Sequence, residues 1–153
     1  MGMMGGFYDS LLEAGFPKDR LYPVNPKADE INGARCYPTL LDTPDPVDHV
    51  ISQVPAAVVP QLVDQCVEKK VRSIHFFTAG VSETGDEDMA ASEHAMVEKL
   101  REAGIRAIGP NCMGLYVPAS RLAFMGGFPM ESGNVFLLSQ SGANAGEIVH
   151  GLT

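Results

Sequence analysis

The sequence predicts an α/β fold in which parallel strands form a doubly wound sheet. Short apolar runs of strand length alternate along the chain with longer segments whose apolar residues recur at helical spacing. These runs give way to proline or glycine, as at Pro55 and Gly109, which is typical of strands that end in tight turns. The 153 residues are enough for one full core, or for one domain and the opening of a second.

The N-terminal part of the chain predicts one helix and one short strand. Residues 5–15 carry apolar side chains at helical spacing and stop at Gly15, with Pro17 beyond, which predicts a helix. Residues 21–24 predict a short parallel strand. We expect residues 28–41 to form a connecting loop with brief helical turns around Ile31 and Leu40, and residues 43–46 to form a turn.

The middle of the chain predicts three further parallel strands, at residues 48–54, 71–78 and 105–108. Between the first two, residues 56–70 place their apolar positions on one helical face, with Lys69 and Lys70 at the end that favours cations. Residues 85–103 predict another helix. Because strands and helices alternate, each helix is expected to connect two parallel strands.

The pattern loosens after Gly114 into a stretch rich in glycine and proline, which indicates a domain boundary. We predict a first domain over residues 1–118, a linker over 119–133 and the start of a second domain over 134–153. Residues 134–138 predict a buried strand of another sheet, and a helix is expected from residue 143 to the end.

Composition excludes several classes of partner. The net charge of −8 argues against nucleic acid, because neutralising phosphates needs clustered Lys and Arg. No apolar run approaches the roughly 18 residues of a membrane span, and no signal peptide is evident, so a cytoplasmic protein without membrane contact is expected. The three cysteines Cys36, Cys66 and Cys112 show neither a disulfide framework nor zinc-type spacing, so no bound metal is expected.

Four predicted strand ends carry residues suited to a ligand. They are Val24-Asn-Pro-Lys27, Ser52-Gln-Val-Pro55, Thr78-Ala-Gly-Val-Ser-Glu83 and Gly109-Pro-Asn-Cys-Met-Gly114. The carboxyl ends of parallel strands meet at one edge of a sheet, where they form a common crevice. Gly109 and Gly114 allow backbone to approach a ligand closely. A binding site is therefore predicted at this edge, and ordinary strand-to-helix turns are the alternative.

These four blocks, in this order, resemble the CoA-binding domain of the NDP-forming acyl-CoA synthetases, a family that includes the succinyl-CoA synthetase alpha subunit and the ADP-forming acetyl-CoA synthetases. The Ser139-Gln-Ser-Gly142 turn resembles the start of the family's next, flavodoxin-like ligase domain. The resemblance implies a Rossmann-like CoA-binding domain that lacks its first strand and Gly-rich loop. It also implies an acid–thiol ligase that works through an acyl-phosphate and a phosphohistidine.

The resemblance implies roles for thirteen residues of this chain. Coenzyme A would be met by Val24, Pro26, Lys27, Val54, Pro55, Thr78, Ala79, Gly80, Asn111 and Cys112, and a phosphoryl group by Ser139, Ser141 and Gly142. An ammonium suits phosphate, which supports Lys27. The alternatives are a solvated Lys27, a Thr78 that simply caps a strand, a turn role for Asn111 that uses left-handed geometry, a buried or turn Cys112, and an N-cap at Ser141.

No catalytic residue is assigned, because in the resembled family the catalytic histidine lies well downstream of the Ser-x-Ser-Gly turn. None of the four histidines, His49, His75, His94 and His150, matches that position. We therefore expect the chain alone to bind CoA or acyl-CoA without turnover. Its expected partner is a second copy or a complementing ligase subunit or domain. A non-catalytic CoA-sensing module is the main alternative; a NAD oxidoreductase is disfavoured because no Gly-x-Gly-x-x-Gly follows a strand.

Overall fold

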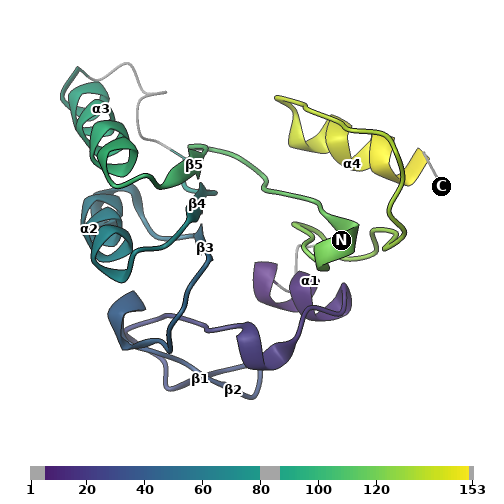
Figure 1. The fold of residues 1–153 in the computed structure, drawn as a ribbon, viewed down its shortest axis with the longest axis horizontal. Coiled ribbons are helices and arrows are strands. Elements are labelled where there is room, and N and C mark those ends of the chain that lie inside the picture. Colours follow the sequence, from purple (N-terminus) through teal and green to yellow (C-terminus); the bar gives the residue numbers. More distant parts are fainter. Residues whose placement is uncertain (1–5, 80–86, 152–153) are drawn as a thin grey trace. The chain divides into compact units, whose positions relative to one another are not determined.

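The computed structural model describes residues 6–79 and 87–151 of the chain. They belong to two compact units (Figure 1). One unit is Tyr22–Cys112, and the other combines Met1–Leu21 with Met113–Thr153. The predicted domain boundaries near residues 118 and 134 stay a prediction.

A three-stranded parallel sheet organises the unit Tyr22–Cys112. Its strands are β3 (His49–Ser52), β4 (Ser73–Phe76) and β5 (Arg106–Ile108), in the order β3-β4-β5. The register pairs Ile51 with His75 and His75 with Ile108, so β4 is bonded on both sides. The predicted α/β class and the three predicted middle strands are confirmed, each strand being shorter than its apolar run.

Two helices connect these strands, as the alternation predicted. Helix α2 (Val59–Lys69) follows the 3₁₀ turn η3 (Ala56–Val58) and leads from β3 to β4, and α3 (Glu87–Glu102) precedes β5. The apolar face of α2 is fully buried at Val63 and Cys66, each 0% exposed, in one cluster with Ile74 of β4. Burying this face excludes water from one side of the sheet, which is the main stabilising contribution of such a layer.

The segment before β3 departs from the prediction. Residues 21–24 form no strand; the described residues record one isolated parallel bridge there, from Val24 to Tyr37. The helical turn expected around Ile31 is wrong, because β1 (Glu30–Ile31) and β2 (Ala34–Arg35) form an antiparallel hairpin. Asn32 and Gly33 join them with φ of 50° and 74°, as a two-residue hairpin turn requires. The second expected helical turn is present as η2 (Leu40–Asp42).

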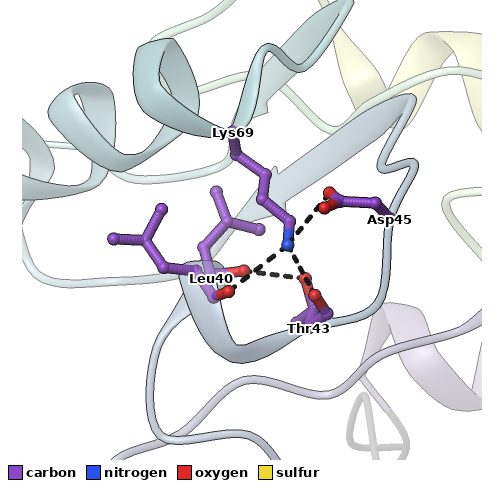
Figure 2. Close-up of polar contacts among 5 residues, drawn as sticks. Leu40, Thr43, Asp45 and Lys69 are labelled. Atoms are coloured by element: carbon purple, nitrogen blue, oxygen red, sulfur yellow. Dashed lines mark hydrogen bonds and ion pairs between the residues drawn. The ribbon is translucent and has the colours of Figure 1, made fainter.

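The Lys69 side chain, at the end of α2, forms hydrogen bonds and an ion pair with η2 and the loop that follows it (Figure 2). Its ammonium donates to the carbonyl oxygens of Leu41 and Thr43 at 3.3 and 2.5 Å and lies 3.0 Å from a carboxylate oxygen of Asp45. The Lys69 side chain is only 7% exposed, whereas that of Asp45 is 74% exposed. The two carbonyls therefore matter more than the exposed ion pair, which water and salt screen.

The other unit contains α1 (Phe7–Glu13) and α4 (Gly142–Gly151), with short 3₁₀ turns η1 (Lys18–Arg20) and η5 (Pro118–Ser120). Both predicted helices are confirmed. Their unit packs around Ala14, Ala123 and Phe128, and Phe128 meets the rings of Tyr116 and Phe124 edge to face at 5.0 Å each. None of the described helices is long and apolar enough to cross a membrane.

The strand predicted at residues 134–138 is wrong for the described structure. These residues pair with no other described segment, and Val135, Phe136 and Leu138 are 68%, 89% and 87% exposed. An apolar run becomes a strand only when a neighbour accepts its backbone hydrogen bonds. The run here has the composition of a buried strand without such a neighbour in the described part of the chain.

We predict that Lys69→Met lowers the free energy of unfolding by about 1–3 kcal/mol, because it leaves the Leu41 and Thr43 carbonyls without their buried donor. Methionine keeps the apolar stem, so packing changes little. Urea unfolding followed by circular dichroism measures the loss. Lys70→Met is the matched control, since Lys70 is exposed, and an equal loss in both variants would contradict the assigned role of Lys69.

Candidate ligand-binding edge of the sheet

Hydrogen bonds join three of the four predicted blocks at the carboxyl edge of the sheet. The Thr78 hydroxyl, two residues past β4, donates to the carbonyl oxygen of Val54 at 2.6 Å. The carbonyl oxygen of Thr78 in turn accepts the backbone N–H of Asn111 at 2.9 Å. Thr78 itself is buried, with 8% of its surface exposed. One residue thus fixes the loops that follow β3 and β5.

The loop after β5 lies directly against β4. Gly109 has φ of 103°, and a Cβ built there would lie 2.4 Å from the Phe76 carbonyl oxygen, so no other residue fits without a backbone shift. The Cys112 N–H donates to that same oxygen at 3.2 Å. Asn111 has φ of 53°, which is the left-handed conformation expected if Asn111 serves as a turn residue. Its side chain is exposed and Cys112 is half-buried.

The remaining block, residues 24–27, is bonded to Tyr37 and, in the described part of the chain, not to the other three blocks. The Asn25 N–H donates to the Tyr37 oxygen, and the Tyr37 N–H donates to the oxygen of Pro23, the residue before the block. The Asn25 side chain accepts the backbone N–H of Lys27 at 2.9 Å, which fixes a local turn. Val24, Pro26 and Lys27 are exposed, and the Lys27 ammonium makes no ion pair with a described residue. No hydrogen bond among the described residues joins this block to Val54, Thr78 or Asn111.

The remaining predicted residues fall in three places. Pro55 and Ala79 are exposed next to Val54 and Thr78, and Gly80 lies outside the described residues. Ser139, Ser141 and Gly142 belong to the other unit. There the Ser141 hydroxyl accepts the N–H of Asn144 at 3.3 Å, and the Ser139 hydroxyl accepts the N–H of Ser141 at 3.1 Å. Ser141 therefore caps α4, as its alternative reading proposed.

Two histidines occupy one face of the sheet. A ring nitrogen of His49 lies 2.8 Å from the Ser73 hydroxyl, and Nε2 of His75 lies 2.6 Å from the Cys112 carbonyl oxygen. Burial lowers the pKa of His49 to about 4, and the neighbouring His75 contributes to the shift. Burial also lowers the pKa of His75, against the opposing effect of its bond to Cys112. Both rings are accordingly neutral at pH 7.

The sequence analysis assigns no binding role to two buried polar residues of this region, of which Ser52 belongs to a predicted block and His75 does not. His75 is 1% exposed and contacts the loop after β5, and Ser52, at the carboxyl end of β3, is 2% exposed with a hydroxyl that has no partner among the described residues. The alternation within Ser73-Ile-His-Phe76, which places His75 on the face opposite Ile74, was the available signal. The partner of His75 is a backbone carbonyl. Because every residue has one, the sequence does not indicate which carbonyl the ring contacts.

A small apolar cavity of about 50 Å³ lies beside this edge, lined partly by Phe76, Thr78 and Gly109. Ligand pockets usually measure about 300–1,000 Å³, so this cavity does not by itself hold a nucleotide. No cluster of three or more His, Cys, Asp or Glu able to hold a metal ion is present in the described part of the chain.

A parallel sheet whose strand-end loops are hydrogen-bonded to one another, with glycine where backbone must pass closely, is the arrangement of an open α/β domain, in which ligands bind outside the carboxyl ends of the strands. Residues 8–118 match the family described as CoA binding domain. The chain therefore belongs to that family.

Known proteins extend the match. The chain is 40% identical over 126 residues to the ADP-forming acetate–CoA ligase of Methanocaldococcus jannaschii, covering 81% of this chain and 17% of that protein. It is 38% identical over 139 residues to the alpha subunit of ADP-forming acetate–CoA ligase I of Pyrococcus furiosus, covering 88% of this chain and 30% of the subunit. The chain thus spans less than a third of the length of either relative.

Solved structures agree on the fold. A Pyrococcus horikoshii protein superposes with a TM-score of 0.83 and 36% identity over 95% of this chain and 33% of its own. The acetyl-coenzyme A synthetase 1 of Candidatus Korarchaeum cryptofilum, in complex with phosphate and ADP, gives a TM-score of 0.77 and 37% identity over 94% of this chain and 30% of its own. These likenesses confirm the Rossmann-like fold expected from the resemblance.

We predict that acid destabilises the protein partly through His49. Its pKa lies near 4 when folded, against about 6.5 for an unfolded histidine, so between these values the unfolded chain binds the extra proton. The free energy of unfolding should therefore fall as pH drops from about 6.5 to 4, with a His49 share of at most about 1.4 kcal/mol per pH unit.

The measurement is urea unfolding at several pH values in that window, compared between the wild type and His49→Gln. The variant should show the shallower pH dependence. His94→Gln, at an exposed position of α3, is the control. Parallel curves for the wild type and His49→Gln would show that His49 does not stay neutral in the folded protein.

Proposed function

We propose that the carboxyl edge of the sheet in Tyr22–Cys112 binds coenzyme A, as the CoA-binding part of an ADP-forming acyl-CoA ligase. The proposal rests on the hydrogen bonds that join Val54, Thr78 and Asn111 at this edge, in a chain that belongs to the CoA binding domain family. This edge presents backbone fixed in position before a ligand arrives, which reduces the entropy lost on binding.

The chemistry of the exposed residues suits the parts of this ligand. Coenzyme A carries phosphates, an adenine ring and a thiol-bearing arm. The Lys27 ammonium, which has no described ion-pair partner, suits a phosphate. Exposed Val24, Pro26 and Pro55 offer apolar surface to a ring, and the loop of Asn111 and Cys112 is assigned to the thiol end of the ligand.

The ligase activity is proposed for the larger protein. Its relatives are named acetate–CoA ligases, and the proposed reaction joins an acid to the CoA thiol through an acyl-phosphate and a phosphohistidine. The Ser139–Gly142 turn is proposed to receive the phosphoryl group, because the positive end of a helix dipole, here the start of α4, favours an anion. The Ser141 hydroxyl already accepts one N–H of this first turn, that of Asn144. A complementing ligase subunit or domain is the proposed partner; two of the Pyrococcus furiosus relatives are themselves named alpha subunits.

CoA titrated into the chain in a calorimeter should give saturable heat. Lys27→Met should weaken the affinity by about 5- to 150-fold, equivalent to about 1–3 kcal/mol for one charge-assisted phosphate contact. Lys70→Met is the control because this exposed lysine directly follows α2, at the opposite edge of the sheet. Equal affinities of wild type and Lys27→Met would remove the lysine from the site, and no binding by wild type would reject the proposal.

The 153-residue chain supplied with acetate, CoA and ATP should form no acyl-CoA. His49 and His75 are engaged within the sheet, and His150 packs against the ring of Phe128 at 5.2 Å between centroids, so none of these three histidines is assigned as the phosphate carrier. A coupled assay for thioester formation measures the outcome. Sustained turnover that one histidine substitution abolishes would show that the chain carries its own phosphorylated residue.

A further inference from the structure

We infer that His75 is a positioning residue for the coenzyme A site, which holds the Asn111–Cys112 turn in place through the bond from its ring to the Cys112 carbonyl. The inference rests on the proposed function for its ligand. The ring and the turn are 37 residues apart in the sequence, and Nε2 lies 2.6 Å from the carbonyl oxygen.

The direction of the bond follows from its acceptor. A carbonyl oxygen has no hydrogen to give, so Nε2 carries the hydrogen and donates it. Burial keeps the ring neutral at pH 7, which places its one hydrogen on Nε2 and fixes the tautomer. At 1% exposure the ring itself offers almost no surface at which water could replace the carbonyl.

Position in the sheet makes His75 a rigid donor. β4 is bonded on both sides, and His75 itself is in register with Ile51 of β3 and Ile108 of β5. The backbone bonds from Cys112 N–H to Phe76 and from Asn111 N–H to Thr78 fix one side of the turn. The His75 bond fixes the carbonyl of Cys112, so that the peptide groups on both sides of this residue are held by β4.

His49 provides a natural comparison. It lies on the same face of the sheet and its pKa is also lowered by burial, yet its ring meets the Ser73 hydroxyl at the amino end of β4. A histidine that only supports the sheet should behave as His49 does. A positioning role requires that loss of His75 also change the loop and its ligand.

The experiment compares wild type with His75→Leu, His75→Gln and His49→Leu. Leucine fills the space without a donor, whereas the glutamine carboxamide places an N–H near the position of Nε2. Calorimetric titration with CoA is done at a temperature where circular dichroism shows every variant folded. Hydrogen exchange at the Asn111 and Cys112 amides, measured by NMR, reports the loop without any ligand.

We expect His75→Leu to weaken CoA binding by at least about tenfold and to speed hydrogen exchange at the Asn111 and Cys112 amides. Exchange at the Ile74 amide, in the middle of β4, should stay unchanged. His75→Gln should restore affinity to within about threefold of wild type, and His49→Leu should lower stability while leaving affinity and loop exchange alone. Wild-type affinity in His75→Leu, or equal losses in His75→Leu and His49→Leu, would overturn the inference. Absence of CoA binding by the wild type would instead overturn the proposed function, while unchanged exchange in His75→Leu would overturn the loop contact itself.

Discussion

The hydrogen bonds that leave the carboxyl end of β4 determine the rest of the candidate site. β4 is the central strand, and three groups at or just past its end bond to residues 111 or 112: the His75 ring, the carbonyl of Phe76 and the carbonyl of Thr78. Thr78 also reaches the loop after β3 through its hydroxyl. β4 is hydrogen-bonded on both sides and packs through Ile74 against α2. The loops after β3 and β5, which bond to the end of β4, are therefore held by the core. A site built this way needs little reorganisation when a ligand arrives.

The elements between β3 and β5 could be predicted from the sequence, because the apolar residues that show the helical or strand pattern are the same residues that pack in the core. The apolar stripe of α2 at Val63 and Cys66 is what packs on the sheet, so the helical period predicts the contact as well as the helix. Residues 134–138 show the converse. Their composition is that of a strand, but a strand is completed by a neighbour's backbone, which composition does not encode. Residues 30–35 were misassigned although Asn32-Gly33 is a strong hairpin signal.

The candidate site was predictable where chain topology alone brings residues together. Thr78 and Asn111 follow neighbouring parallel strands, so their meeting is a consequence of the sheet order. Lys27 belongs to a segment held by Tyr37, outside the ladder of β3, β4 and β5, and topology of those strands says nothing about its place. Its assignment rests on charge chemistry and on family likeness, which is why the affinity of a Lys27 variant carries more information than any contact of this residue.

His75 illustrates how a histidine can serve a site without the chemistry usually sought in one. The search for catalytic histidines asks for a nearby nucleophile, metal or phosphate, and a ring bonded to a backbone carbonyl meets none of these criteria. Yet a buried neutral imidazole has one N–H donor, the pleat of β4 places the His75 ring on the face of the sheet opposite Ile74, and there the donor meets the Cys112 carbonyl. Gly109 serves the same loop in the opposite manner, since its missing side chain lets the backbone pass within contact of Phe76. The donor of one residue and the absence of a side chain in the other together determine where Asn111 is presented.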